Sequence, residues 1–230
     1  MNWDNINEID RQMTLALNGS DSIFLDNLMM TITNTFAWSL VMITLIVIFV
    51  RNNDIRETLI LLATIAVMMI VADRLCSGLV KPLMARWRPT QDPQIMHLVD
   101  VVNGYRGGRF GFFSGHACNT FTMAMFLSRL FHSRRTTIVL FLWALTTTFT
   151  RLYLGVHYLG DVTVGMIAGL IIGSVFYALY HFIMTKVRSS RLTSNQFTKT
   201  GYKKDDMNIL LFVIFLNYIL VLIFAIIRGV

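Results

Sequence analysis

The sequence predicts an all-α polytopic membrane protein, in which six transmembrane helices form a bundle and an N-terminal amphipathic helix lies on the membrane surface. Hydrophobic residues fill 55% of the 230 positions and charged residues only 14%, whereas a soluble domain carries about 25% charge. Long uncharged runs are therefore expected, and runs of ~20 apolar residues cross a bilayer as helices. All three prolines fall between positions 82 and 93, which predicts one irregular segment there and helices elsewhere.

The composition also argues against several classes of protein. A soluble enzyme, a disordered chain and a small disulfide-held domain all disagree with so apolar a chain that contains two cysteines. The net charge of +7 would suit a nucleic-acid binder. Lys and Arg stand, however, in short connectors between apolar runs, where such residues set membrane orientation. The bilayer, and no nucleic acid, is the expected partner.

The elements follow in order along the chain. Within residues 1–26, Ile6, Ile9 and Met13 recur at helical spacing among charged residues, which predicts an amphipathic surface helix. The six spans are predicted at residues 27–50, 58–80, 116–130, 136–150, 161–186 and 208–227. The connector at 187–207 is rich in Ser, Thr and Lys and is predicted to be a basic cytoplasmic linker. One membrane domain over residues 1–230 is expected, with the functional residues inside 27–186 and the sixth span inside 208–230.

The distribution of basic residues predicts the orientation. With six spans, the connectors at 51–57, 129–135 and 186–206 lie on one side and together carry 11 of the 20 basic residues. Cytoplasmic connectors are enriched in Lys and Arg. Both termini and the segment 81–113 are therefore expected on the other side, which is the periplasm or the exterior for a bacterial inner (cytoplasmic) membrane.

Three polar clusters stand next to the predicted spans. In the first, Lys81 and Arg88 are seven positions apart, so two helical turns would bring them to one face. Arginine holds phosphate oxygens with two donors and lysine adds a point charge, so the pair suits a phosphate. Ordinary anchoring at the membrane interface is the alternative.

The second cluster is Ser114, Gly115 and His116, directly before the third span. Ser114 is suited to cap that helix and Gly115 to let the backbone approach a ligand. Free amides and the helix dipole make such a start an anion site, and His116 would lie within reach for proton transfer. A simple capped helix with a surface histidine is the alternative.

The third cluster, Arg151, His157 and Asp161, links the fourth and fifth spans. His157 and Asp161 are four apart, so one helical turn would set the carboxylate against an imidazole nitrogen. Such a contact fixes the tautomer and leaves the other nitrogen free as a nucleophile. An interfacial histidine beside a capping aspartate is the alternative.

Taken together, the three clusters read Lys81, six residues, Arg88-Pro89; Ser114-Gly115-His116; and Arg151, five residues, His157, three residues, Asp161. This pattern resembles the type 2 phosphatidic-acid phosphatase superfamily of membrane lipid phosphatases, which is related to the vanadium haloperoxidases. Two positions depart from it: Phe113 stands where many members have Pro, and Thr150 where many have Ser. Neither departure removes a catalytic group.

The resemblance implies a metal-independent mechanism without a cofactor. His157 would attack phosphorus and form a phosphohistidine while Asp161 orients it, and His116 would protonate the leaving oxygen and then activate water. The phosphate oxygens would be held by Lys81, Arg88, Ser114, Gly115 and Arg151. A zinc site built from the two histidines and Asp161 is disfavoured, because three nearby cations would repel the metal.

The substrate is less well defined by the sequence. Arg106 and Arg109 lie in a glycine-rich segment and, with Arg86, are candidates for contacts to a second phosphate. This favours a diphosphate or a multiply charged headgroup, and undecaprenyl diphosphate is the leading hypothesis. Lipid A 1-phosphate, phosphatidic acid and phosphatidylglycerol phosphate are the alternatives, and bilayer headgroups are another role for these arginines.

A non-catalytic lipid-binding or transport protein is the alternative of a different class. His116, His157 and Asp161 are all present, which argues against it. Transporters also place their ionisable residues near the middle of the membrane, whereas these residues lie next to its surface. No obligate protein partner is implied.

Overall fold

The computed structural model describes residues 3–187 and 194–229, and all of its regular elements within those residues are helices. The predicted all-α fold class is therefore confirmed. The helices are α1 (Trp3–Ala16), α2 (Ile23–Ile32), α3 (Ser39–Asn52), α4 (Ile55–Asp73), α5 (Lys81–Met84), α6 (Gly115–Phe131), α7 (Arg134–Tyr153), α8 (Leu159–Val187) and α9 (Lys204–Gly229).

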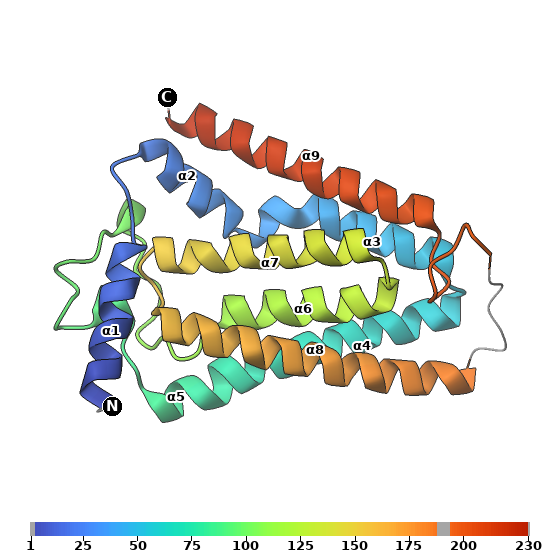
Figure 1. The fold of residues 1–230 in the computed structure, drawn as a ribbon, viewed down its shortest axis with the longest axis horizontal. Coiled ribbons are helices and arrows are strands. Elements are labelled where there is room, and N and C mark those ends of the chain that lie inside the picture. Colours follow the sequence, from blue (N-terminus) through green and yellow to red (C-terminus); the bar gives the residue numbers. More distant parts are fainter. Residues whose placement is uncertain (1–2, 188–193, 230) are drawn as a thin grey trace.

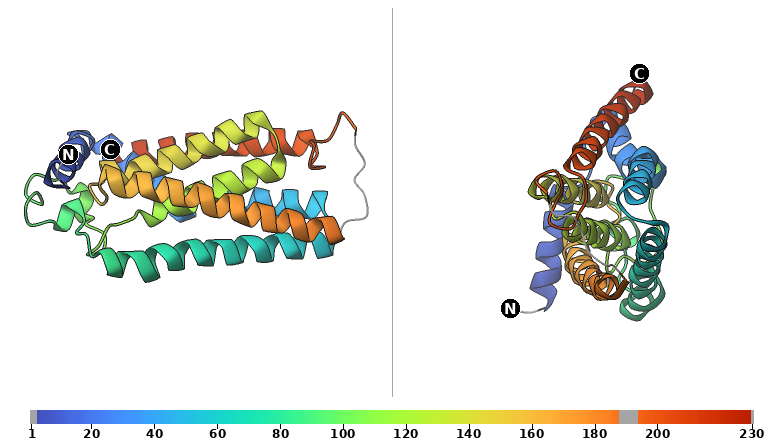
Figure 2. Two further views of the ribbon diagram at one scale, coloured as in Figure 1. Left: turned by 60° about the horizontal axis from the view of Figure 1, so that its bottom comes forward. Right: turned by 90° about the vertical axis from the view of Figure 1, so that its right-hand side faces the viewer.

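The long helices run alongside one another, and α1 lies across one end of the bundle (Figure 1). The last turn of α9 is at the same end as α1 (Figures 1 and 2). On α1, Ile9 and Met13 expose about half of their surface (46% and 50%). This arrangement agrees with the predicted amphipathic helix at the surface.

Four helical stretches in the described part of the chain are long and apolar enough to cross a membrane: Thr35–Asn52, Ile55–Met84, Leu159–Val187 and Lys204–Arg228. They correspond to four of the six predicted spans. The other two, α6 and α7, run among them but are shorter or more polar. Most of α6 is buried by its neighbours, so it does not need an apolar face toward lipid.

The predicted first span, 27–50, is wrong at its start. The helix α2 ends at Ile32, and a 3₁₀ turn (Thr35–Trp38) leads into α3. The reason is Asn34, whose side chain accepts a 3.0 Å hydrogen bond from the amide of Phe36 and so begins a new turn. The sixth span also differs, because α9 begins inside the predicted linker 187–207, of which residues 188–193 lie outside the described residues.

The second span is longer than predicted and carries Lys81 at its end. After α4, a π-helical segment (Arg74–Val80) continues into α5, so that one helical path runs from Ile55 to Met84. It stops at Ala85, which adopts the left-handed conformation with φ of 44°. The following irregular segment contains 3₁₀ turns at Pro89–Gln91 and Val102–Gly104.

Three glycines on α8 set its distance from α6. Gly165, Gly169 and Gly173 recur every fourth residue, and a methyl group on each would lie 2.5–2.6 Å from a backbone carbonyl oxygen of α6. Small residues at this spacing let two membrane helices approach closely. The contact brings the start of α8 next to the start of α6, where two of the polar clusters lie.

Candidate active site

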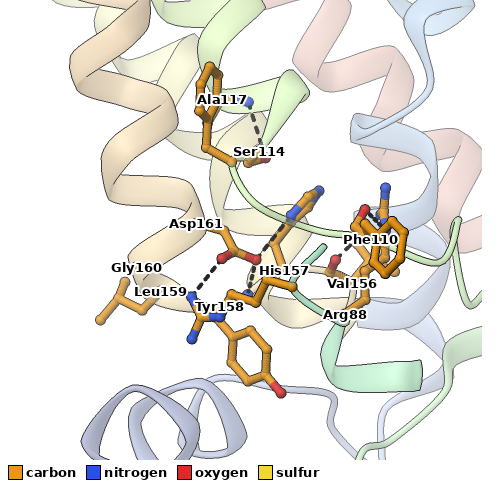
Figure 3. A network of polar contacts seen from close by, with 12 residues as sticks. Arg88, Phe110, Ser114, Ala117, Val156, His157, Tyr158, Leu159, Gly160 and Asp161 are labelled. Carbon is orange, nitrogen blue, oxygen red and sulfur yellow. Dashed lines mark hydrogen bonds and ion pairs between the residues drawn. The ribbon is translucent and has the colours of Figure 1, made fainter. Parts of the chain in front are cut away.

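The three polar clusters meet at the end of the bundle that α1 covers (Figure 3). The amide of Ser114 donates a 2.9 Å hydrogen bond to the carbonyl of Asp161, which joins the second cluster to the third. Arg88 donates from Nη1 to the carbonyl of Val156 at 3.4 Å, which joins the first cluster to the third. The structure thus brings together residues that are far apart in the sequence.

His157 and Asp161 face each other across the start of α8. Nδ1 of His157 lies 3.5 Å from Oδ2 of Asp161, and the same oxygen accepts a 3.1 Å hydrogen bond from the amide of Tyr158. His157 is 1% exposed and Asp161 is fully buried. Because Nδ1 faces the carboxylate, Nε2 is the nitrogen left for a substrate.

The surroundings of His157 keep its imidazole neutral. Burial lowers the pKa of His157 well below its ordinary value, and the positive charges of Arg88, Arg151 and Lys81 lower it further. A neutral imidazole retains the lone pair that a nucleophile needs. The site therefore favours the form of His157 that can attack phosphorus.

Arg88 is fixed by the backbone of the irregular segment. Its side chain is buried, and Nε donates to the carbonyl of Phe110 at 3.1 Å. Gly107, with φ of +66°, comes so close that a methyl group on it would lie 2.6 Å from Nη1 of Arg88. Burial and then the charge of Arg151 lower the pKa of Arg88, yet a guanidinium stays charged in proteins.

Arg151 is held by two hydroxyl groups. Nη1 donates to Oγ1 of Thr33 at 2.6 Å and Nη2 to the hydroxyl of Tyr105 at 3.0 Å, whereas the buried Nε has no hydrogen-bond partner among the described residues. Burial opposes ionisation of Tyr105, but the charge of Arg151 and its hydrogen bond outweigh that effect and lower the pKa of Tyr105. These two hydrogen bonds use two of the five N–H groups of Arg151, so the Nε–H and one N–H on each terminal nitrogen are left for a ligand.

Within the described residues, Lys81, Arg88 and Arg151 have no carboxylate within ion-pair distance. Charges removed from water are costly unless an opposite charge compensates them. Arg151 is only 2% exposed and Arg88 8%. An anion between the three cations would supply the missing charge.

The Ser114-Gly115-His116 sequence begins α6 as predicted. Oγ of Ser114 accepts a 3.4 Å hydrogen bond from the amide of Ala117 and so caps the helix. A methyl group on Gly115 would lie 3.8 Å from Nζ of Lys81. The lysine ammonium therefore lies near the start of α6, where the helix dipole and free first-turn amides favour an anion.

A mostly apolar cavity of about 240 Å³ lies beside His116. It is lined by residues of α2, α3, α4, α6 and α7, of the 3₁₀ turn before α3 and of the connection after α2, among them Thr33, Trp38, Met69 and Trp143. The cavity extends from the end of the bundle into its apolar part. An apolar molecule whose polar end lies at His116 would fit these walls.

The three arginines predicted to contact a headgroup each have protein contacts. Arg86 forms 2.7 Å ion pairs with Asp10 and Asp161. Arg106, which is exposed, donates from Nη1 to the carbonyl of Thr90 at 3.0 Å. The guanidinium of Arg109 lies 4.5 Å from the ring centre of Trp87 and 5.2 Å from that of Phe110. Both terminal nitrogens of Arg86 are thus occupied by carboxylates.

Sequence reasoning missed Asp10, Thr33 and Tyr105, although all three contact the arginines of the site. Each belongs to an element distant in sequence from its partner. Asp10 has no local pattern that distinguishes it from the other acidic residues of α1. Only the docking of α1 and α2 against the bundle brings Asp10 and Thr33 to the site.

Comparisons with known proteins place this geometry in a family. The sequence model of the PAP2 superfamily matches residues 57–185. Lipid A 4'-phosphatase of Bacteroides thetaiotaomicron is 38% identical over 185 residues, covering 80% of this chain and 82% of that protein. Lipid A 4'-phosphatase of Porphyromonas gingivalis is 31% identical over 179 residues, covering 78% and 76%.

Two solved structures share the fold. LpxE of Aquifex aeolicus aligns with a TM-score of 0.54 at 21% identity, covering 73% of this chain and 93% of that one. A PAP2-type phosphatidylglycerolphosphate phosphatase of Bacillus subtilis aligns with a TM-score of 0.55 at 22% identity, covering 81% and 90%. At this identity the likeness concerns the fold alone.

Proposed function

This chain belongs to the PAP2 superfamily and is a membrane lipid phosphatase, and we propose that it hydrolyses a phosphate monoester of lipid A, with the 4'-phosphate as the preferred position. The main support is the neutral His157 within a cluster of three cations that have no protein counter-ion among the described residues. That arrangement suits a phosphate in front of a nucleophile. The position on lipid A is suggested by the names of the two relatives, each matched over more than three quarters of its length.

The proposed mechanism proceeds through a phosphohistidine. Nε2 of His157 attacks phosphorus while Asp161 holds the opposite nitrogen. His116 donates a proton to the leaving oxygen and then accepts one from the water that releases the phosphate. The phosphate oxygens are held by Lys81, Arg88, Arg151, the hydroxyl of Ser114 and the amide of Gly115. Charge spreads over those oxygens in the transition state, so cations and amides placed around them lower the barrier.

No metal is assigned to the reaction. Three side-chain cations already face the phosphate oxygens, and they would repel a divalent ion held by His116, His157 and Asp161. The side-chain cations therefore supply the charge that a metal supplies in many other phosphatases.

The apolar cavity beside His116 supports a position for the lipid in the proposed mechanism. His116 protonates the leaving oxygen in the proposed mechanism, so the lipid body must extend from the His116 side of the phosphate. The cavity of about 240 Å³ is on that side. We propose a lateral entry from the bilayer into this cavity, because the apolar part of the substrate stays in the membrane.

Undecaprenyl diphosphate is the second candidate. The sequence supports it through three arginines that could contact a second phosphate. In the structure one of them, Arg86, forms ion pairs with Asp10 and Asp161 instead. Arg106 and Arg109 remain exposed on the loop, so they are free to contact headgroups. This leaves a weaker basis for a diphosphate than for a monoester.

We propose that the protein lies in the inner membrane of a bacterium with its site toward the periplasm or the exterior. The connectors at the far end of the bundle hold most of the basic residues, counted over the sequence, and such connectors face the cytoplasm. Labelling of single cysteines introduced at Arg106 and at Arg134 with a membrane-impermeant reagent tests the orientation. Labelling in intact spheroplasts is expected at position 106 only, and the reverse pattern would invert the assignment.

The function is tested by phosphate release from purified protein in detergent with EDTA. Bisphosphorylated lipid A, undecaprenyl diphosphate and phosphatidic acid serve as substrates, and His157→Ala is the matched control. Release from lipid A is expected to survive EDTA and to vanish in the variant, with mass spectrometry locating the lost phosphate. Fastest release from undecaprenyl diphosphate would contradict the substrate assignment, and loss of activity with EDTA would contradict the mechanism.

A further inference from the structure

The guanidinium of Arg86 lies between two carboxylates from opposite parts of the chain. Nη1 is 2.7 Å from Oδ1 of Asp161, and Nη2 is 2.7 Å from Oδ2 of Asp10 on α1. The ring of Tyr158 covers it, with its centre 4.3 Å from Cζ. The side chain of Asp161 is fully buried, and those of Asp10 and Arg86 are 13% and 25% exposed. Sheltered, short ion pairs of this kind are stronger than pairs on an open surface.

The helix α1 also caps the start of α8. The first amides of a helix have no partner within it, and a residue directly before the helix usually binds them. Here the amide of Leu159 donates to Oγ1 of Thr14 at 3.0 Å, and that of Gly160 to Oδ1 of Asp10 at 2.8 Å. Because His157 stands just before these amides and Asp161 just after them, contacts from α1 fix the turn that holds both.

Asp161 is thus held from two sides. Its Oδ2 faces the imidazole of His157 and accepts from the amide of Tyr158, while its Oδ1 is bound by Arg86. Without Arg86, a fully buried carboxylate would lose its positive partner beside a histidine that is itself neutral. The carboxylate would then be free to leave the orientation that it needs toward Nδ1.

We propose that Arg86 and Asp10 are positioning residues of the phosphatase: Arg86 orients Asp161 toward His157, and Asp10 orients Arg86, so that the N-terminal surface helix completes the catalytic machinery. This inference rests on the proposed function, in which His157 is the nucleophile. Arg86 is one of the six unspecified residues between Lys81 and Arg88 in the first cluster, and Asp10 lies outside all three clusters.

Direct contact between Arg86 and a lipid headgroup is the competing role. Arg86 borders a cavity of about 550 Å³ that also touches Arg11, Met84 and Asp92. Both terminal nitrogens of Arg86, which an arginine uses to grip a phosphate, are however engaged by carboxylates. A headgroup ligand would mainly affect the binding of substrate, whereas a positioning residue affects the chemical step.

The first test compares kcat and KM of the full chain in detergent for Arg86→Met, Arg86→Lys, Asp10→Asn and the double variant Asp10→Asn/Arg86→Met. The substrate is whichever lipid phosphate the wild type hydrolyses fastest. Glu8→Gln is the matched control, because Glu8 lies on the same helix with its side chain 56% exposed, and its polar side-chain contacts within the described part of the chain are with its α1 neighbours Arg11 and Gln12.

Loss of a residue that orients a catalytic group costs about 10–100-fold, so kcat of Arg86→Met is expected to fall by about that factor while KM stays nearly constant. Asp10→Asn loses less, Arg86→Lys recovers part of the loss, and Glu8→Gln is unchanged. The double variant is expected to match Arg86→Met, because both changes break one chain of contacts. A raised KM with unchanged kcat, or losses that multiply in the double variant, would overturn the proposal.

The second test needs no substrate, so it stands even if the proposed function fails. The ¹⁵N resonances of the His157 imidazole, assigned by their absence in His157→Gln, report its contact with Asp161. They are expected to shift in Arg86→Met and Asp10→Asn but not in Glu8→Gln. Arg86→Lys replaces Arg86→Met if the latter does not fold. Unchanged resonances in the folded Arg86 and Asp10 variants would show that these residues do not act on His157.

Discussion

The backbone amide of Ser114 donates a 2.9 Å hydrogen bond to the backbone carbonyl of Asp161. This bond joins the start of α6, whose amides face the phosphate in the proposed mechanism, to the start of α8, which carries Asp161. Close packing of the two helices through Gly165, Gly169 and Gly173 holds the two starts in register. The distance between the phosphate site and His157 is therefore set by helix packing as well as by the site residues themselves.

Asp161→Asn is expected to reduce kcat strongly without unfolding the protein. An amide fills the same space but does not fix the imidazole tautomer as a carboxylate does, and the corresponding change in a serine-protease triad costs about 10⁴-fold in kcat. Steady-state kinetics and acid-quench trapping of the phosphohistidine measure the effect. A variant with near wild-type kcat would show that His157 needs no orienting carboxylate.

Arg88→Ala and Arg151→Ala are each expected to lower kcat/KM by about 10²–10³-fold, as removal of one preorganised donor to a developing charge does in other enzymes. Lysine at either position is expected to restore only part of the activity, because its ammonium lacks the planar fork of donors with which a guanidinium binds two oxygens at once. The matched control is Arg106→Ala, a change at an exposed arginine outside this cluster. An equal loss of kcat/KM in Arg106→Ala would show that the effect is not specific to the two buried arginines.

The imidazole of His157 is expected to stay neutral as the pH falls through about 6.5, the ordinary value for histidine, because burial and the neighbouring cations lower its pKa. Arg88→Met removes one of those charges and is expected to raise the pKa of His157. Titration of the His157 ¹⁵N resonances measures both. Protonation of wild-type His157 near 6.5 would contradict the electrostatic description.

The lowered pKa of His157 also makes the stability of the folded protein depend on pH. The folded-state pKa of His157 lies below the unfolded value, so the unfolded chain binds the proton more readily below about pH 6.5. The contribution of His157 to stability is therefore complete above that pH and is lost as the pH falls toward the folded-state pKa. Unfolding temperatures in detergent are expected to fall over that range less steeply in His157→Gln than in the wild type. Parallel curves would assign the acid sensitivity to other groups.

Gly169→Ala is expected to destabilise the bundle. Its methyl group would lie 2.5 Å from the carbonyl oxygen of Cys118, so α8 and α6 would have to separate, at a cost of about 1–3 kcal/mol for an overpacked interior. Gly78→Ala is the matched control, because its nearest neighbour would be 3.8 Å away and alanine favours a helix by up to about 1 kcal/mol over glycine. Thermal unfolding compares the two, and equal stabilities would argue against close packing at Gly169.

Helices and clusters could be predicted from the sequence because both depend on local patterns. Apolar runs and the confinement of proline located the long helices, and the spacing of four between His157 and Asp161 holds in the structure, where the two face each other. The break at Asn34 was missed, because it depends on one side chain bonding to the backbone two residues later. The apolar run continues across it without any change in hydrophobicity.

The two residues that depart from the family pattern, Phe113 and Thr150, are both buried in the structure. Phe113 is 4% exposed and packs in the core, and its carbonyl accepts a hydrogen bond from the thiol of Cys76 at 3.1 Å. Thr150 is fully buried, and its hydroxyl donates to the carbonyl of Thr147 at 2.6 Å. Among the described residues, neither side chain forms a hydrogen bond with His116, His157 or Asp161, and both side chains are buried.

The role of α1 was beyond sequence reasoning for a different reason. Its periodicity correctly predicted a surface helix, but a polar residue such as Asp10 on that helix is expected to face water. The bond from the Gly160 amide to Asp10 links residues 150 positions apart, and no local pattern encodes such a partner. Nor does the sequence distinguish Arg86, which binds both carboxylates, from the other arginines near the site.

Because Asp10 and Gly160 are 150 positions apart in the sequence, they are synthesised at different times. The segment that forms α1 leaves the ribosome first, and the segment that forms α8 follows only after most of the chain has been made. Lys81, Arg88 and His116 are therefore synthesised before the contact between α1 and α8 can form. Contacts between residues so far apart in sequence form late and slowly, so under the proposed role of Asp10 the enzyme becomes active only after α1 has docked on α8.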